Sequence, residues 1–331
     1  MYLSQLLVDV GANPDRPRPG RLWLRNLYRV HQRLCMAFPS DPRKQKDPAF
    51  LAPFASADFA YCGQAEAAME PGGDVHEERT QEAGFLFRID HRLWRCEPHG
   101  DDAAMPSPMI LVLSAREPDW GYAFGLLDSA GAKGNGAHLL AAPPQVAEIV
   151  AEPEADGFRL RTRPICQNGR VKGQNQNAGL LLTPGARFRF RLNANPTRRL
   201  GSGPFAGKRV SVGRHPRVLL DWLWGRARNS GAPKKAERGL GFEPVFEPDT
   251  VMTFRDEETK WDSRWRIVTS YVHAWKKNWR KEEETLKMTF ACATFDGILE
   301  VTNPALFLHA LYSGIGSGKA FGFGLLSLAR V

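Results

Sequence analysis

A glycine-rich segment near the end of the chain has the composition of an anion-binding loop. Residues 314–324 contain five glycines in eleven positions, with Lys319 among them. Glycine permits positive φ angles and close approach of the backbone to a ligand, and successive free N–H groups beside a lysine can face a phosphate. The segment is not a Walker loop, because Ser313 stands at the first glycine position and Ala320 follows the lysine. It predicts either contact with the backbone of a polyanion or a turn that only lets a helix pack against the last strand.

Tyr28 and His31 are a second pair of residues that could do chemistry. Apolar residues recur at helical spacing from residue 24 to 38, and Pro39 ends the predicted helix. Tyr28 and His31 lie three residues apart and therefore share a face of that helix. Histidine suits proton transfer because its ordinary pKa, about 6.5, is near working pH. Spacing alone nevertheless favours a structural histidine at the edge of the core.

The charge of the chain is unevenly distributed. The net charge is +9, yet the segment from Gly157 to Leu220, here called the acid-free segment, holds fourteen Lys and Arg and no Asp or Glu. The rest of the chain holds 31 basic and 36 acidic residues. A short charge run is usually a solvated face, but a run this long repels itself unless a polyanion meets it. The segment predicts nucleic-acid binding.

Composition narrows the class of protein. The 331 residues suffice for two domains, and no apolar run reaches the length of a membrane span. The five cysteines lie far apart without a CxxC pair, which argues against a zinc site or a disulfide framework and favours a reducing cytoplasm. The start lacks the basic region of a signal peptide. With no valid phosphate loop and no evident carboxylate pair for magnesium, we expect no cofactor and no metal.

Two similar series of elements are expected along the chain. In the second half, Phe188, Phe190 and Leu192 alternate with Arg187, Arg189 and Arg191, which predicts a strand with one buried face and one basic face. The remaining strands are predicted at 3–10, 85–90, 109–115, 158–165, 286–295, 298–301 and 323–331, and the remaining helices at 143–150, 218–228 and 305–312. The order predicts an α+β fold with two tandem ferredoxin-like (RRM-like, βαββαβ) domains, at residues 1–156 and 157–331.

Four stretches resemble a known family, the CasE-type endoribonucleases of type I-E CRISPR systems. They are the opening Met-Tyr-Leu-Ser, residues 27–34 (Leu-Tyr-Arg-Val-His-Gln-Arg-Leu), residues 189–196 (Arg-Phe-Arg-Leu-Asn-Ala-Asn-Pro) and residues 314–328. Glu117-Pro118-Asp119-Trp120, Gly207-Lys208-Arg209-Val210 and Gly241-Phe242 fall between them in the expected order. The resemblance therefore spans both ends of the chain.

The resemblance implies a function and a site. Members of the family have two ferredoxin-like domains, cut precursor CRISPR RNA at the base of a repeat stem-loop without metal, and stay bound to the product in the surveillance complex Cascade. The partners would be the repeat RNA and other Cascade subunits, with no membrane involved. His31 would be the catalytic histidine and Tyr28 its neighbour. Some relatives have a lysine where this chain has Met36, and Asn193 stands where relatives often have arginine. The segments 40–80, 121–178 and 252–284 are longer than in shorter members.

RNA contacts are expected along the basic strand and the glycine-rich segment. A-form RNA hides its base edges in a narrow major groove, so that proteins contact phosphates, shape and stem ends. Residues 275–281 (Trp-Lys-Lys-Asn-Trp-Arg-Lys) stand where relatives have a basic hairpin, and their alternative is a solvated loop. The expected RNA-binding residues are Arg187, Arg189, Arg191, Arg198, Arg199, Lys208, Arg209, Lys276, Lys277, Arg280, Lys281, Gly316, Gly318 and Lys319.

The chemistry expected from the resemblance is a metal-independent transesterification. A ribose 2′-OH attacks its own 3′-phosphate and leaves a 2′,3′-cyclic phosphate and a 5′-OH. His31 is expected to act as general acid for the leaving oxygen, although its sequence position does not separate acid from base. The alternative is a non-catalytic RNA-binding subunit of a CRISPR ribonucleoprotein, in which His31 is structural.

Overall fold

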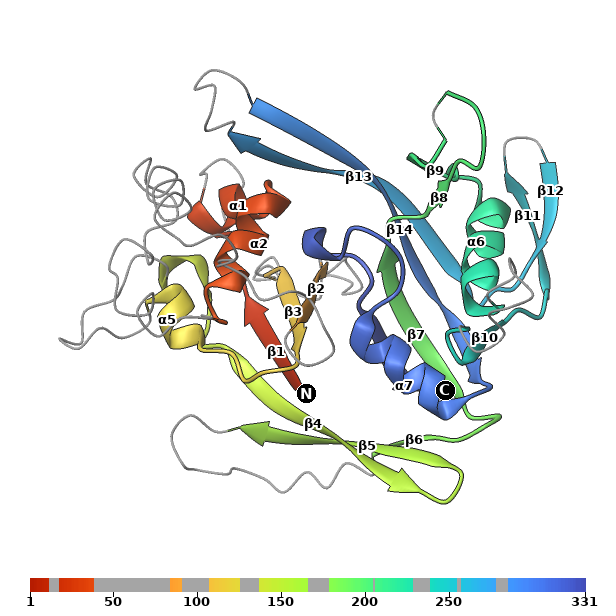
Figure 1. The fold of residues 1–331 in the computed structure, drawn as a ribbon, viewed down its shortest axis with the longest axis horizontal. Helices are drawn as coiled ribbons and strands as arrows, with labels where there is room; N and C mark the ends of the chain where they lie inside the picture. The colour runs from red at the N-terminus through yellow and green to blue at the C-terminus, as the bar shows by residue number, and fades with distance from the viewer. Residues whose placement is uncertain are drawn as a thin grey trace, which may run out of the picture. The chain divides into compact units, whose positions relative to one another are not determined.

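In a computed structural model, the protein contains two antiparallel sheets with helices packed against them (Figure 1). The structure describes residues 1–11, 18–38, 84–90, 107–125, 137–165, 179–204, 206–228, 239–254, 257–277 and 285–331. The predicted variable loop at 40–80 lies outside these residues. None of the helices within the described residues is long and apolar enough to cross a membrane.

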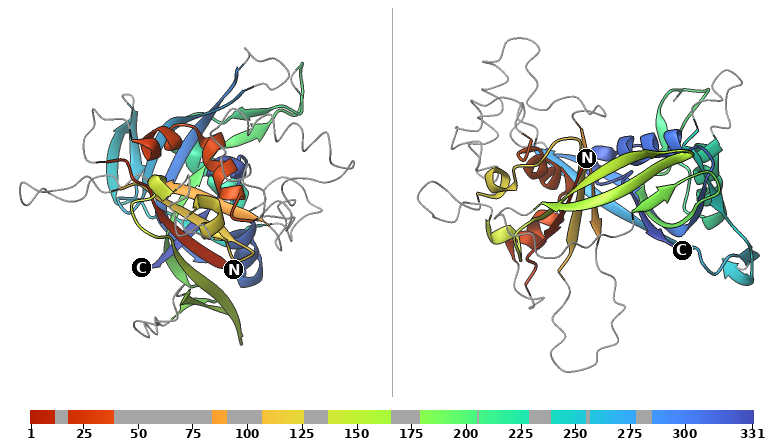
Figure 2. Two further views of the ribbon diagram at one scale, coloured as in Figure 1. Left: turned by 90° about the vertical axis from the view of Figure 1, so that its left-hand side faces the viewer. Right: turned by 90° about the horizontal axis from the view of Figure 1, so that it is seen from below.

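The first sheet has the strand order β2-β3-β1-β4-β5-β6. β3 is antiparallel to both β1 and β2. Numbered along the chain, its first four strands are ordered 2-3-1-4 with helices after the first and third, which is the ferredoxin-like arrangement. β4 and β5 run side by side as a long ribbon (Figure 2). The elements are β1 (Tyr2–Leu7), α1 (Pro19–Leu24), α2 (Leu27–Cys35), β2 (Phe85–Asp90), β3 (Met109–Ser114), α5 (Trp120–Phe124), the 3₁₀ helix η2 (Ala137–Leu139), β4 (Gln145–Glu154), β5 (Gly157–Ile165) and β6 (Leu180–Leu182).

The second sheet repeats this arrangement. Its order is β10-β14-β7-β15, with β13 also paired to β14, and these four strands again read 2-3-1-4. The predicted fold class, α+β with two tandem ferredoxin-like domains, is confirmed. The elements are β7 (Arg187–Ala194), β8 (Thr197–Arg199), β9 (Arg209–Ser211), α6 (Pro216–Arg228), β10 (Phe242–Val245), β11 (Thr250–Phe254), β12 (Glu257–Trp261), β13 (Arg266–Lys277), β14 (Thr285–Val301), α7 (Pro304–Ser313), the 3₁₀ helix η4 (Lys319–Phe321) and β15 (Leu326–Arg330).

The core of the second sheet follows directly from the alternation in β7. Phe188, Phe190 and Leu192 are buried, whereas the three arginines between them are exposed. The buried face meets apolar residues of α6 and α7, among them Leu223 and Phe307, in one continuous cluster. Burial of large apolar side chains is the main stabilising term of such a layer. The basic face is consequently left on the outside.

The chain divides into two compact units that are not continuous in sequence. Unit 1 contains Met1–Ala147 and His273–Thr289, and unit 2 contains Glu148–Val272 and Phe290–Val331. Unit 1 therefore includes the end of β13 and the start of β14. The division at residues 156 and 157 stays a prediction.

Three predicted elements differ from the structure. The helix predicted at 143–150 is strand β4, because pairing in a sheet overrides the helical spacing of a few apolar, partly β-branched residues. The helix predicted at 24–38 begins only at Leu27, because Asn26 is extended and caps it, and Leu24 is the last residue of the separate helix α1. The strands predicted at 286–295 and 298–301 are the single strand β14. Its Gly297 is no turn: a side chain there would collide with the ring of Trp265.

Candidate functional site

Helix α2 positions the two predicted catalytic residues. Leu27, Val30 and Leu34 are buried at helical spacing, and this fixes which face is turned to the core. Tyr28 and His31 are both half-buried and lie one helical turn apart. Met36, the position at which some relatives have lysine, is buried with only 4% of its surface exposed. It therefore offers no second basic group.

Asn26 holds the start of α2 and was not singled out in the sequence. Its side-chain oxygen accepts the backbone N–H of Tyr28 at 3.1 Å, which is an N-cap. The same side chain donates to the carbonyl of Trp275 at 2.9 Å and accepts that residue's N–H at 3.2 Å. Asn26 is 2% exposed, so these bonds are shielded from water. The cap thus joins α2 to the end of β13 within unit 1. An Asn directly before a series of apolar residues at helical spacing could have predicted this cap.

The ring of His31 is held between α2 and strand β2. Its centroid lies 5.7 Å from that of Phe85 and 6.5 Å from that of Phe87, and both pairs are stacked. The sulfur of Cys35, one turn further along α2, lies 3.6 Å from Nε2 and 3.9 Å from Nδ1 of the imidazole. Flat rings therefore restrict the tilt of the imidazole, and a thiol contacts its polar edge. These contacts leave the ring half-buried, which suits proton transfer at a surface and equally suits a structural histidine.

The glycine-rich loop is attached to the end of β7. The N–H of Gly324 donates to the carbonyl of Asn193 at 2.8 Å, and Ser317 forms a bridge with Asn195. The Ser317 hydroxyl also lies 2.9 Å from that of Thr197. The loop is therefore a fixed structure rather than a loose connection. Asn193, where relatives often have arginine, uses its side-chain oxygen within the sheet, where it accepts from Cys292 at 2.7 Å.

Packing explains part of the glycine content of this loop. A side chain at Gly318 would meet the ring of Phe323 at 2.9 Å, and one at Gly316 would touch Trp222 at 3.4 Å. Both glycines also have positive φ angles, 76° and 87°. Lys319 donates from Nζ to the carbonyl of Ser313 at 2.5 Å and so folds back on its own loop. RNA contact by Gly316, Gly318 and Lys319 stays a prediction.

The arginines of β7 meet carboxylates of the neighbouring strand β14. Nε of Arg187 lies 2.8 Å from Glu300, and Nε of Arg191 lies 2.6 Å from Asp296. Each pair stands directly opposite in the antiparallel register. Arg189 stands opposite Ile298 instead. The acid-free segment therefore receives acidic partners from β14, which lies more than a hundred residues further along the chain.

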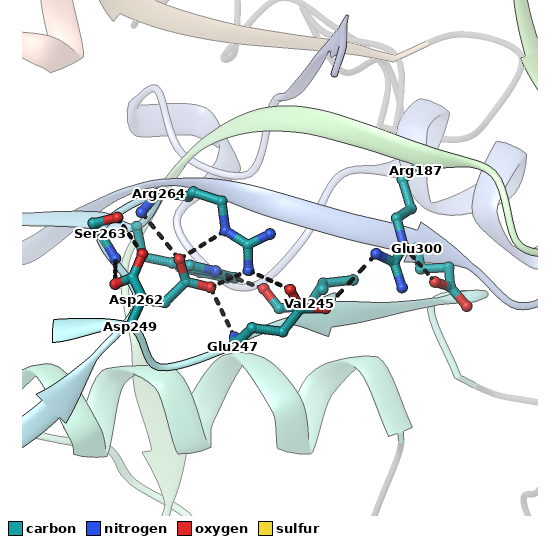
Figure 3. A network of polar contacts seen from close by, with 9 residues as sticks. Arg187, Val245, Glu247, Asp249, Asp262, Ser263, Arg264 and Glu300 are labelled. Carbon is teal, nitrogen blue, oxygen red and sulfur yellow. Dashed lines mark hydrogen bonds and ion pairs between the residues drawn. The ribbon is translucent and has the colours of Figure 1, made fainter.

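Arg187 is also part of a larger polar network (Figure 3). A second carboxylate, Glu247, lies 3.7 Å from it and also 3.1 Å from Arg264. Arg264 in turn binds the fully buried Asp262, whose carboxylate also accepts the N–H of Glu247 at 2.8 Å. The hydrogen bond from Arg264 lowers the pKa of Asp262, and the backbone N–H groups add to this effect. The network anchors the exposed charge of Arg187.

The ribbon of β8 and β9, here called the basic ribbon, is different. Arg199 stands directly opposite Arg209, and Arg198 opposite Val210. Within the described part of the chain, Arg198, Arg199 and Arg209 form no ion pair with a carboxylate. Nearby on α6, desolvation lowers the pKa of Arg226, and the positive charge of Arg209 lowers it further. Like charges held together without acids favour an anionic ligand.

The remaining predicted residues are only partly described. Lys276 and Lys277 are the last two residues of β13, directly after Trp275. Arg280 and Lys281 lie outside the described residues, and their contact with RNA stays a prediction. Lys208 lies just before β9, in the turn of the basic ribbon.

Comparisons with known proteins find similar sequences and structures. Residues 176–330 match the family described as CRISPR associated protein. The chain is 28% identical over 238 residues to the CRISPR-associated endoribonuclease Cse3 of Thermus thermophilus, which covers 72% of this chain and 79% of the relative. Similar solved structures include Cse3 bound to a 19-nucleotide RNA (23% identity, TM-score 0.47) and Cas6e of Escherichia coli (16%, 0.42), each covering all of both chains.

The two sequence comparisons cover different parts of the chain. The segment that matches the CRISPR associated protein family includes β7 and the glycine-rich loop. The similarity to Cse3 extends beyond that segment, and it agrees with the resemblance drawn from the sequence motifs.

Proposed function

We propose that this protein is a metal-independent endoribonuclease that cuts precursor CRISPR RNA at the base of the repeat stem-loop. The observation that carries the proposal is His31, a half-buried imidazole held on α2 by two aromatic rings and a thiol, one turn from Tyr28. A relative named as an endoribonuclease adds support. The protein then stays bound to its product in a Cascade-type complex, in the cytoplasm. Cys35 and Cys292 form no disulfide in the described part of the chain, which suits that compartment.

The reaction is an in-line transesterification within the RNA. The 2′-oxygen upstream of the cut forms a bond to its own 3′-phosphorus, and the bond from phosphorus to the downstream 5′-oxygen breaks. His31 gives a proton to that leaving oxygen, and Tyr28 orients the 2′-OH or binds the phosphate. The products are a 2′,3′-cyclic phosphate and a 5′-OH. Because the nucleophile is already tethered, the protein mainly orients it and moves protons.

The basic ribbon holds the RNA backbone in this proposal. Arg198, Arg199 and Arg209 have no acidic partner among the described residues and can each give a charge-assisted bond to phosphate. Arg189 adds a third exposed arginine on β7. Fixed donors of this kind also stabilise charge on the phosphate in the transition state. Further contacts are proposed for Lys208, Lys276, Lys277, Arg280, Lys281, Arg187, Arg191, Gly316, Gly318 and Lys319.

The decisive experiment follows single-turnover cleavage of a labelled repeat RNA in the presence of a chelator. His31→Ala should slow cleavage by about 10²–10⁴-fold, the usual cost of losing a general acid or base, and leave RNA affinity nearly unchanged. Tyr28→Phe should cost less. His309→Ala, which removes an exposed histidine of α7, is the matched control and should cleave normally. A 2′-deoxy substitution upstream of the cut should abolish cleavage. A requirement for magnesium would overturn the mechanism.

A non-catalytic RNA-binding subunit is the second candidate. The stacking of His31 on Phe85 and the burial of Met36 favour it, because both fit a histidine with a structural role only. In that case the purified protein binds the repeat RNA but releases no cyclic phosphate. His31→Ala would then lower the melting temperature rather than a cleavage rate.

A further inference from the structure

Exposed aromatic rings are rare in the described part of the protein. Of the aromatic side chains there, only Tyr271 and Trp275, both on β13, rank among the exposed large hydrophobic residues, at 54% and 37%. Tyr271 is thus the more exposed ring, in a strand whose neighbouring residues are otherwise polar or half-buried. An exposed ring does nothing for the core, so its surroundings indicate what it contacts.

Arg214 lies over this ring and is fixed there. Its guanidinium carbon is 5.1 Å from the centroid of Tyr271. Both Nε and one terminal nitrogen lie 3.3 Å from the hydroxyl of Thr269, two residues earlier on the same face of β13. Two bonds to one hydroxyl and a cation–π contact restrict a side chain that is otherwise exposed. Ring and guanidinium therefore form a preformed pair on the surface of unit 2.

Among the described residues, Arg214 and Arg217 have no acidic partner. Arg214 forms no ion pair with a carboxylate among the described residues, and it follows β9 of the basic ribbon by three positions. Arg217 is exposed in the first turn of α6, a turn that contains no acidic residue. The run from Lys208 to Arg217 thus carries positive charge beside an open aromatic ring. That combination is how proteins bind unpaired nucleotides, because bases stack on aromatic and guanidinium planes while cations meet the phosphates.

We propose that Tyr271 and Arg214 form a stacking platform for one unpaired base of the RNA beside its duplex. The base lies against the ring of Tyr271, and Arg214 contributes its plane and its charge to the same nucleotide. Bases inside a stem are already stacked on each other, so the platform selects the single-stranded flank. The inference rests on the proposed function in that the ligand is RNA, and it assigns a part of that RNA which the catalytic residues do not contact.

The test uses full-length protein and a repeat hairpin made uncleavable by a 2′-deoxy group at the cut. 2-Aminopurine replaces one unpaired nucleotide at a time on either side of the stem. In the wild type, one position should lose fluorescence on binding. Tyr271→Ala should abolish that change and weaken binding by roughly 5- to 150-fold, the loss that one stacked base gives. Tyr271→Phe should retain both, and Arg214→Ala should fall between.

Two control variants separate the platform from a general loss of exposed apolar area or of positive charge. Met252→Ala removes another exposed apolar side chain, and Arg228→Ala another exposed arginine of unit 2; neither should change the fluorescence. On a hairpin trimmed to its stem, wild type and Tyr271→Ala should bind equally. If Tyr271→Ala lost the same affinity for trimmed and untrimmed RNA, or lost none for either, the stacking platform would be refuted. The surface would then be a candidate for contact with another protein. A wild type that binds without cutting the 2′-hydroxyl RNA refutes the nuclease, not the platform.

Discussion

Among the arginines of the acid-free segment, those of β7 and those of the basic ribbon have opposite surroundings. On β7, Arg187 and Arg191 each stand opposite a carboxylate of β14. On the basic ribbon, Arg199 stands opposite Arg209. The difference follows from what each strand pairs with: β7 is central in a sheet and has a distant strand as neighbour, whereas β8 and β9 pair only with each other. The absence of Asp and Glu from a stretch of sequence therefore does not show that its arginines lack acidic partners. The neighbouring strand decides which arginines keep an uncompensated positive charge.

Removal of the basic ribbon should have the largest effect on RNA binding. Charged hydrogen bonds contribute about 1.5–3 kcal/mol each, so the triple change Arg198→Ala, Arg199→Ala and Arg209→Ala should weaken affinity by about 100-fold or more. The slope of log affinity against log salt should decrease by about 0.9 per lost contact, as on B-form duplex. Arg187→Ala with Arg191→Ala should lose clearly less. Equal losses measured by filter binding would erase the distinction between the two groups.

The network behind Arg187 should contribute measurably to stability. Asp262→Asn keeps the shape but removes the charge that binds Arg264, and the free energy of unfolding should fall by about 2 kcal/mol at neutral pH. The folded pKa of Asp262 is lowered, so its contribution is present above the unfolded pKa and disappears as pH falls through the folded value. Urea unfolding at pH 7 and near pH 2 measures this. A difference between wild type and variant that persisted undiminished in acid would contradict it.

Removal of the carboxylates opposite the β7 arginines should strengthen RNA binding. Asp296→Asn with Glu300→Gln removes the acids opposite Arg191 and Arg187, and the freed guanidinium groups should raise RNA affinity by several-fold. Glu243→Gln, which frees Arg228 on α6, is the matched control and should leave affinity unchanged. If both variants bound the RNA alike, the exposed ion pairs would not compete with phosphate.

The smallest expected effect is on the stability of the unbound protein, through the like charges of the basic ribbon. Arg209→Thr relieves the like charge opposite Arg199 and should raise the free energy of unfolding of the unbound protein by about 0.2–1 kcal/mol. Thermal melting with and without RNA checks this, because the same variant should gain less from RNA than the wild type. An unbound variant that melted below the wild type would show that the two arginines do not repel each other.

Local patterns predicted most of the fold. The alternation in 187–192 predicted β7 and both of its faces, and the helix predicted at 305–312 is α7, which the Asn303 side chain caps at 3.0 Å. The spacing of Tyr28 and His31 gave their common face. Helix 143–150 was wrong because its few apolar residues fit either period until β4 pairs with its neighbours.

Long-range contacts escaped prediction because no local pattern encodes them. The stacking of His31 on Phe85 and Phe87 joins residues more than fifty positions apart. The acids opposite Arg187 and Arg191 lie 113 and 105 positions further along the chain. The same holds for Arg214 and Tyr271, whose separate sequence neighbourhoods give no hint of a common surface. The sequence therefore predicted which residues belong to the candidate site, but not which residues surround them.

The bond between Asn26 and Trp275 has a consequence for the order of events during synthesis. The two residues are 249 positions apart, and unit 1 is completed by residues 273–289. While the nascent chain is short, the helix that carries His31 can form its cap to Tyr28 but not the contacts of Asn26 with β13. The contacts of Asn26 with Trp275 therefore form late, whereas those of His31 with Cys35, Phe85 and Phe87 join residues synthesised early.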